Sequence, residues 1–243
     1  MPPPDVAALV VAALGEELAP LRRALAVSVE RLDGRRVFRA RGTAPALVFA
    51  STGDGPSNAA SRAARLCERY RPAVLVGIGV AGAITPNLAP LDLVVSSKLR
   101  NGSGEGPRAD EILLRRATAG GALPATLVTT GTPVVSVAAK RALAAPGEDS
   151  AAVDMESTAW AKAAAAAGVP FVVVRGIADA ADEELPEYLP RCLGADGGIR
   201  RSAVVARALA RPGTFPALWK LRRRLSGCAE RLSAFLLDRF FSR

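Results

Sequence analysis

The chain has 243 residues, 50% of them hydrophobic and 23% charged, which is typical of a well-packed globular protein with one large domain. It contains 32 Lys and Arg, 23 Asp and Glu, and no histidine, so its formal net charge is +9. The lack of histidine excludes a Ser-His-Asp triad, a Cys-His dyad and a His-containing zinc site. Catalysis would have to rely on carboxylates, hydroxyls, lysines or backbone dipoles.

The positive charge is concentrated at one end of the sequence. Residues 1–199 carry 21 basic and 21 acidic side chains, whereas residues 200–243 carry 11 basic and 2 acidic ones. A general nucleic-acid-binding surface would spread its basic residues over the folded domain. The charge of this tail therefore needs its own explanation.

The predicted elements alternate between strands and helices along the chain. Buried apolar runs predict strands over residues 6–13, 37–40, 46–50, 73–78, 91–96, 125–130 and 171–177. Helical spacing predicts helices over residues 16–25, 57–70 and 156–167, with Ser57 or Asn58 as the cap of the second helix. This alternation favours an α/β fold, with a largely parallel sheet covered on both faces.

The tail from Phe215 onward has the pattern of a basic amphipathic helix. Apolar residues recur there at steps of three and four, arginines lie between them, and Trp219 stands near the start. Glycine-containing hinges are expected at residues 197–198 and 211–213. Such a helix could dock on the core or a second subunit, or lie at a membrane surface. A nucleic-acid arm is less favoured because the tail is too apolar.

Two glycine-rich turns follow predicted strands, where open α/β sheets place their ligands. The turn over residues 51–58 contains Gly53 and Gly55, and the turn over residues 77–82 contains Gly79 and Val80. Such turns let backbone N–H groups approach an anion or a sugar oxygen. Each could equally be an ordinary tight turn.

Acidic residues stand out at three places along the chain, two of them directly after a predicted strand. Glu17 comes after the first strand, Asp154 and Glu156 flank Met155 at a predicted helix start, and Asp179 follows the strand over residues 171–177. Each acid alone could be a dipole partner or a turn residue. Three acids that converge at one sheet edge would indicate a site, since buried carboxylates are costly unless used.

The chain resembles the nucleoside phosphorylase/nucleosidase superfamily, and most closely the methylthioadenosine/S-adenosylhomocysteine nucleosidases. The resemblance rests on residues 11–17 (VAALGEE), 77–82 (GIGVAG), 152–156 (AVDME) and 173–179 (VVRGIAD), in the family's order. It covers about residues 6–185 and implies a three-layer αβα sandwich around a mixed, largely parallel sheet. The tail is similar to that of the hopanoid-associated phosphorylases, which are thought to remove adenine from adenosylhopane.

The resemblance also implies roles for the acids. Asp179 matches the acid that contacts or protonates the purine, and Glu17 matches the carboxylate that positions the attacking water. Glu156 matches the carboxylate that binds the ribose hydroxyls, and Met155 packs against the sugar. Asp154, Gly79, Val80, Gly53, Gly55 and Val135 complete the predicted substrate-binding set. The resemblance implies no metal and no organic cofactor.

Three departures from the family pattern bear on the substrate. Val80 and Ala178 stand where the nucleosidases carry serines, and the region of their base-stacking aromatic residue offers only valines, among them Val135. These changes suit a more apolar substrate than the usual small thioethers. The phosphate-binding motifs of purine phosphorylases are not evident, which favours water as the nucleophile.

The resulting interpretation is an enzyme that cleaves the N-glycosidic bond of an adenosine-type nucleoside, with adenosylhopane as the expected substrate. A methylthioadenosine/S-adenosylhomocysteine nucleosidase is the first alternative. A non-catalytic, membrane-associated nucleoside-binding module is the second.

We predict a catalytic domain over residues 1–195 and a basic helical extension over residues 196–243. Three separated cysteines without a CxxC pair favour a reducing cytoplasm. We expect a homo-oligomer, no nucleic-acid partner and no membrane span. A peripheral contact with the inner face of the membrane through residues 215–243 is one of the open alternatives for the tail.

Overall fold

The computed structural model describes residues 6–42, 46–102, 104–192, 194 and 200–241. Its strands are β1 (Val6–Ala12), β2 (Val27–Leu32), β3 (Arg35–Ala40), β4 (Leu47–Ser51), β5 (Pro72–Ala83), β6 (Leu93–Asn101), β7 (Gly104–Glu105), β8 (Leu123–Thr129), β9 (Ala151–Asp154) and β10 (Phe171–Asp179). Its α-helices are α1 (Ala19–Ala24), α2 (Pro56–Tyr70), α3 (Glu111–Ala119), α4 (Val137–Leu143), α5 (Ser157–Ala166), α6 (Arg201–Ala210) and α7 (Phe215–Phe235). Short helical turns are η1 (Leu189–Cys192), η2 (Pro212–Thr214) and η3 (Leu236–Phe240).

The strands form one mixed sheet that is parallel at its centre. β1 pairs in parallel with both β4 and β5, and β5 pairs in parallel with β10. β5 is long enough to pair also with β9 at its far end, while β10 pairs with β6. Strands β5, β10, β6, β8 and β9 therefore close into a circuit, and β1, β4, β3 and β2 extend the sheet from β5.

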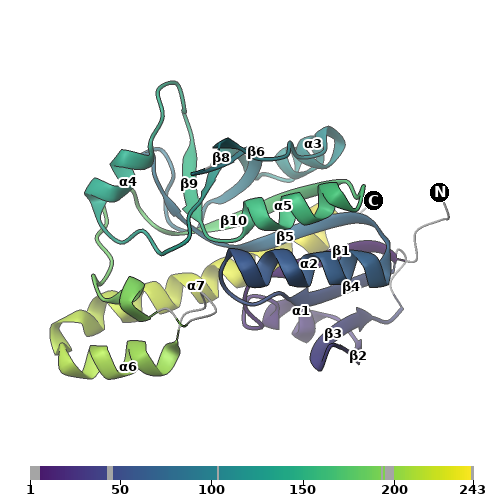
Figure 1. The fold of residues 1–243 in the computed structure, drawn as a ribbon, viewed down its shortest axis with the longest axis horizontal. Coiled ribbons are helices and arrows are strands. Elements are labelled where there is room, and N and C mark those ends of the chain that lie inside the picture. The colour runs from purple at the N-terminus through teal and green to yellow at the C-terminus, as the bar shows by residue number, and fades with distance from the viewer. Residues whose placement is uncertain (1–5, 43–45, 103, 193, 195–199, 242–243) are drawn as a thin grey trace.

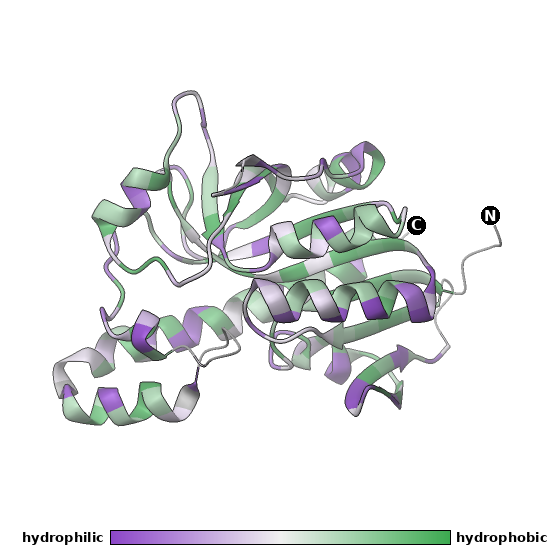
Figure 2. Cartoon of the chain, viewed as in Figure 1, coloured by the Kyte–Doolittle hydropathy of each residue, from purple (hydrophilic) through white to green (hydrophobic). Residues whose placement is uncertain are grey.

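Helices cover both faces of the sheet, which confirms the predicted three-layer α/β architecture (Figure 1). On one face α2 and α5 pack together, and their buried residues share a core with the strands. On the other face Leu21 of α1, Leu113 of α3 and Leu232 of α7 share a second core with Val10 and Val76. The apolar strands between these layers stand out in Figure 2.

All seven predicted strands are confirmed, with shifted ends, but two details of the helices were wrong. The helix expected over residues 16–25 begins only at Ala19, because residues before it form a turn and Pro20 occupies the first helical turn. Neither Ser57 nor Asn58 caps α2: its N-cap is Gly55, and Pro56 follows at the first helical position. Asn58 instead donates from its side chain to Asp54 O at 3.0 Å.

The predicted amphipathic tail is confirmed as α7, continued by η3. Its second half is docked: Leu232, Phe235, Leu236 and Phe240 are buried against the sheet core. Cys228 Sγ contacts Ile177 O at 3.3 Å, and Gly176 leaves room for the Cys228 side chain against β10. The tail therefore completes one helical layer.

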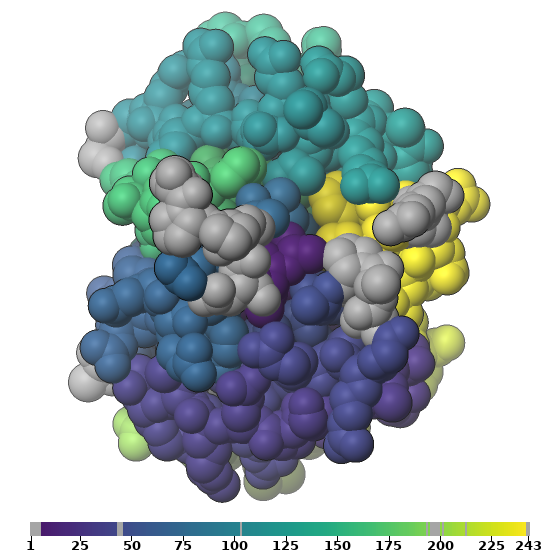
Figure 3. Space-filling view, turned by 90° about the vertical axis from the view of Figure 1, so that its right-hand side faces the viewer, coloured from purple at the N-terminus to yellow at the C-terminus, as the bar shows by residue number. Residues whose placement is uncertain are grey.

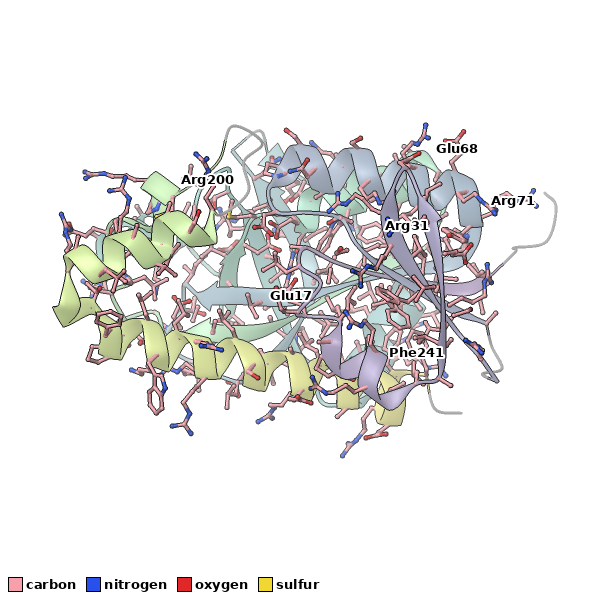
Figure 4. The ribbon with its side chains drawn as sticks, turned by 90° about the horizontal axis from the view of Figure 1, so that it is seen from below. Glu17, Arg31, Glu68, Arg71, Arg200 and Phe241 are labelled. Atoms are coloured by element: carbon pink, nitrogen blue, oxygen red, sulfur yellow. The ribbon has the colours of Figure 1, made fainter. Side chains whose placement is uncertain are left out.

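The first half of α7 projects beyond the sheet, with α6 running beside it (Figures 1 and 4). Phe215 and Trp219 are exposed there, and Arg223 lies over the Trp219 ring at 4.8 Å. At the opposite end of the molecule, α7 contacts α1, and η3 contacts α3 (Figure 3). The predicted hinge at residues 197–198 and the domain boundary at 195/196 lie outside the described residues.

Across the described part of the chain, every helix is too short or too polar to span a bilayer.

Candidate active site

The candidate site lies where β5 and β10 run side by side towards their carboxyl ends. In this pairing Arg175 of β10 stands opposite Gly79 of β5, and Asp179 stands opposite Gly82. Glu17, in the turn after β1, reaches the same edge, since Glu17 Oε1 and Arg175 both lie against Gly79. Figure 4 shows Glu17 in the interior, between the two helical layers.

Glu17 is held in a buried, preorganised position. Its Oε2 accepts a hydrogen bond from Leu14 N at 2.8 Å, and the Val80 main chain also contacts its carboxylate. Burial raises the pKa of Glu17, while the hydrogen bonds and Arg175 oppose that shift. A carboxyl held in this way can accept a hydrogen bond from a water and so fix the position of that water.

Arg175 is the cation around which this part of the site is organised. It is 1% exposed, and its guanidinium lies 4.6 Å from the centre of the Trp160 ring. Its Nε and Nη2 donate hydrogen bonds to Ser157 Oγ at 3.2 and 3.1 Å. Its Nη2 lies 2.5 Å from Asp154 Oδ2 and 3.6 Å from Glu156 Oε2. A Cβ at position 79 would overlap Arg175 Nη1, so this approach requires glycine.

Glu156 joins the Arg175 group to the first glycine-rich turn. It is the N-cap residue of α5, and its Oε1 accepts from Gly55 N at 2.9 Å. Desolvation by burial raises the pKa of Glu156 to about 8, against the opposing charge of Arg175. Near neutral pH this carboxyl can therefore be a hydrogen-bond donor as well as an acceptor towards a sugar hydroxyl.

Asp154 is held by contacts on both of its carboxylate oxygens, and Met155 is partly exposed. Asp154 is bonded on both carboxylate oxygens, because Oδ1 accepts from Thr129 Oγ1 at 2.9 Å and Oδ2 contacts Arg175 and Ser157. The geometry shows Asp154 fixing Arg175 and the start of α5. Met155 is half-buried between the two acids.

Asp179 lies at the end of β10 beside a buried lysine. Its Oδ2 is 2.5 Å from Lys140 Nζ, and Gly82 leaves room for the carboxylate, which would lie 2.8 Å from a Cβ at that position. Burial raises the pKa of Asp179, while Lys140 opposes the shift. An acid of this kind can donate a proton to a leaving group.

The structure places the glycine-rich turn and Val80 at the site, and Val135 in a separate apolar cluster. Gly53 and Gly55, both with positive φ, form the turn that leads into α2 and supplies the N–H bound by Glu156. Val80 is half-buried beside Glu17. Val135 packs against the apolar cluster of Tyr188, Leu189 and Cys192, which Leu218 of α7 also contacts.

Two functional candidates, Arg175 and Lys140, were missed by the sequence analysis. Arg175 interrupts an otherwise apolar strand, and a charge in such a run must be paired. That signal was available. Lys140 gives no comparable signal, because it stands beside Arg141 in a short helix, where a lysine is ordinarily exposed to solvent.

Comparisons with known proteins show the family of the chain. The family model described as the phosphorylase superfamily matches residues 7–193. A 5′-methylthioadenosine/S-adenosylhomocysteine nucleosidase of Geobacillus thermodenitrificans is 30% identical over 73% of this chain and 85% of its own length. A nucleosidase of the same name from Listeria monocytogenes is 25% identical, over 72% of this chain and 87% of its own.

Solved structures share the fold at lower sequence identity. A 5′-methylthioadenosine/S-adenosylhomocysteine nucleosidase of Campylobacter jejuni superposes with a TM-score of 0.74 at 20% identity, covering 96% of this chain and 97% of the other. The futalosine hydrolase of Helicobacter pylori superposes with a TM-score of 0.75 at 18% identity, covering 96% of each chain. The chain therefore belongs to the phosphorylase superfamily, as an enzyme acting on N-glycosyl bonds and related to the 5′-methylthioadenosine/S-adenosylhomocysteine nucleosidases.

Proposed function

We propose that this protein cleaves the N-glycosidic bond of an adenosine-type nucleoside and releases adenine. The observation that carries the proposal is the gathering of Glu17, Glu156 and Asp179 at one edge of the sheet, with Arg175 among them. Related nucleosidases and a futalosine hydrolase share the fold or family.

The reaction passes through a sugar with oxocarbenium character, so it needs carboxylates near the ribose and an acid near the base. Asp179 donates a proton to the departing purine. Glu156 binds the ribose hydroxyls, with Met155 against the sugar, and Glu17 orients the nucleophile beside Gly79 and Val80. Gly53 and Gly55 carry the turn that holds Glu156, and Asp154 keeps Arg175 in place. Chemistry of this kind requires no cofactor.

Water is the nucleophile we propose. Glu17 is a buried acceptor held by main-chain N–H groups, which suits the orientation of a neutral water. Phosphate would bring negative charge next to Asp154, which already pairs with the buried Arg175. That carboxylate would repel it.

For the substrate we propose an adenosine with a large apolar 5′ group, adenosylhopane in particular. Val80 and Val135 offer apolar side chains, and Val135 belongs to an apolar cluster that reaches the tail through Leu218. A methylthioadenosine/S-adenosylhomocysteine nucleosidase remains the alternative, supported by the related sequences.

We further propose that the tail contacts an anionic membrane surface from the cytoplasmic side. The exposed apolar residues of α6 and the first half of α7 are Val205, Leu209, Phe215, Trp219 and Leu225. Arg222 and Arg223 lie among them, a combination that suits the interface of an anionic bilayer. Within the described part of the predicted segment 215–243, the projecting part presents the large exposed apolar side chains, whereas Leu232, Phe235, Leu236 and Phe240 farther along are buried. The expected homo-oligomer stays a prediction, which light scattering of the purified protein tests.

The activity is tested by measuring adenine released from methylthioadenosine, S-adenosylhomocysteine and adenosylhopane. We expect release from at least one of these nucleosides, with the largest kcat/KM for adenosylhopane. Asp179→Asn should keep the fold and lose release by about 100-fold or more, as expected on removal of a general acid. Unchanged activity of this variant would refute the role of Asp179.

The same assay separates the alternatives. Preference for the two thioethers would favour the ordinary nucleosidase. Tight binding of nucleosides without any adenine release would favour the non-catalytic binding module and contradict the proposal.

The membrane contact is tested by sedimentation with vesicles that contain anionic lipid. Trp219→Ser should weaken binding, and Arg222→Ala should weaken it by about fivefold, since one basic residue near such a surface contributes about 1 kcal/mol. Ile112→Ser, at an equally exposed apolar position on α3, is the matched control. Binding that is equal for all four proteins would rule out this surface.

A further inference from the structure

Lys140 is a fully buried cation with an acceptor for each of its protons. The residue projects from α4 and is 0% exposed. Its Nζ donates to Ala180 O at 2.7 Å and to Glu183 O at 2.8 Å, and lies 2.5 Å from Asp179 Oδ2. An ammonium has three N–H donors and no acceptor, so these partners match the charged form of lysine.

The contacts of Lys140 belong to a clasp, by which we mean α4 together with residues 180–185. The two parts are tied where α4 begins, because Val137 N donates to Glu184 Oε1 at 2.9 Å, and Leu185 N donates to Val135 O, just before the helix, at 2.8 Å. The clasp closes directly over the end of β10, where Asp179 lies. The position of Lys140 relative to Asp179 is therefore fixed by backbone contacts.

Helix α7 holds the clasp from the other side. Lys220 Nζ lies 3.0 Å from Glu183 Oε1, and Arg224 contacts Glu183 Oε2 and donates to Ala178 O at 3.3 Å. Lys140, Glu183 and Arg224 are the charged groups that face Asp179, from α4, residues 180–185 and α7 respectively, while β5 presents the uncharged Gly82. Lys140 is the one in direct contact with its carboxylate.

We propose that Lys140 is the positioning residue of Asp179: it orients the carboxylate at the end of β10 and balances its charge inside the protein. This inference rests on the proposed function, in which Asp179 serves the leaving base. Without a cation at this place, a buried carboxylate would keep its proton to a higher pH, because desolvation would act unopposed. Lys140 thus determines the pH range over which Asp179 can exchange a proton.

The experiment combines a stability cycle with a pH profile. Wild type, Lys140→Met, Asp179→Asn and the double variant are unfolded in urea at pH 5.5 and 8.5. Methionine is unbranched and apolar, so it can fill the buried volume of the lysine chain. Lys162→Met, at an exposed position of α5, is the matched control.

Proton linkage gives the direction in which the stability of Lys140→Met should change with pH. In Lys140→Met the folded state keeps the Asp179 proton that the unfolded chain releases, so stability falls as pH rises. The unfolding constant should rise with pH more steeply than in wild type, by up to about tenfold per pH unit within the affected range. The Asp179→Asn background should abolish this difference.

The activity profile gives the second readout. In a plot of kcat/KM against pH, activity falls where Asp179 loses its proton. In Lys140→Met the midpoint of this fall should move to higher pH, by about one to three pH units. Lys140→Arg keeps the charge and should restore the midpoint towards that of wild type.

A loss of stability in Lys140→Met that is equal at both pH values and persists with Asp179→Asn would overturn the inference, since a purely structural lysine behaves in that way. A pH dependence of kcat/KM that is the same in Lys140→Met and in wild type would also overturn it. If the wild type released no adenine, the proposed function would fail, but the stability cycle would still decide whether Lys140 balances Asp179.

Discussion

Arg175 illustrates how one buried cation can organise several acids. Glu17, Asp154 and Glu156 all approach its guanidinium, and Asp154 is the nearest of those measured. Several carboxylates cannot all be charged cheaply around one cation in a buried site. The pKa of Glu156 is raised to about 8 chiefly by desolvation, and the neighbouring Asp154 and Glu17 add to the rise, while Arg175 opposes it.

The raised pKa of Glu156 predicts a dependence of stability on pH. The folded protein holds the Glu156 proton up to about pH 8, whereas the unfolded chain releases it near pH 4.3. Between these values the free energy of unfolding falls as pH rises, by up to about 1.4 kcal/mol per pH unit from this group. Glu156→Gln should flatten that fall. Urea unfolding at pH 5.5 and 7.5 measures it, and parallel pH dependences for the two proteins would contradict the assignment.

We expect a larger residue at position 82 to displace the Asp179 carboxylate and to slow adenine release. A Cβ at residue 82 would lie 2.8 Å from Asp179 Oδ2, so Gly82→Ala must displace the carboxylate. A displacement of about 1 Å at a reacting group can cost about 100-fold in rate, and we expect a loss of adenine release of that order. Gly131→Ala, where a Cβ meets nothing within 4 Å, is the control. Equal rates for the two variants would show that Asp179 does not need its present position.

Glu17 and Asp179 could be predicted from sequence because each lies at the end of a long apolar run, whereas Asp154 and Glu156 stood out as acids at a predicted helix start. Their partners could not all be predicted. Arg175 was detectable as a charge inside a buried run, but the pairing of Lys140 with Asp179 depends on how residues 180–185 fold over α4. That arrangement is tertiary and leaves no local pattern.

At the scale of elements, long apolar runs were predicted well and short elements were not. β9 has 4 residues and α4 has 7, too few to show a period. The edge strand β2 was missed although Asp33 and Gly34, both with positive φ, form the turn between β2 and β3. An Asp-Gly pair between two strand-like runs is a hairpin signal that could have been used.

We expect substitutions in the two halves of α7 to change the free energy of unfolding by different amounts. Leu232 is 0% exposed and lies in the second core, so Leu232→Ala should lower the free energy of unfolding by about 2–5 kcal/mol. Leu225, on the same helix, is 37% exposed, and Leu225→Ala should cost less than about 1 kcal/mol. Urea denaturation compares the two variants. Equal small effects would mean that the tail does not dock on the sheet in solution.

At the scale of the molecule, the charge of +9 divides into a neutral body and a basic tail. The tail has two structural parts: a buried half that completes a helical layer and a projecting half with exposed apolar and basic residues. Through Lys220 and Arg224 it also holds the clasp over Asp179. Sequence patterning predicted the helix. Where α7 changes from buried to projecting depends on which of its residues pack against β10.

The central claim is that this site cleaves an adenosine-type nucleoside with water. The most direct measurement identifies both products of the purified enzyme, with and without inorganic phosphate, by mass spectrometry. The account predicts adenine and a free sugar at the same rate in both conditions. A sugar 1-phosphate formed only when phosphate is present would contradict water as the nucleophile, and the absence of adenine from every nucleoside tested would contradict the claim itself.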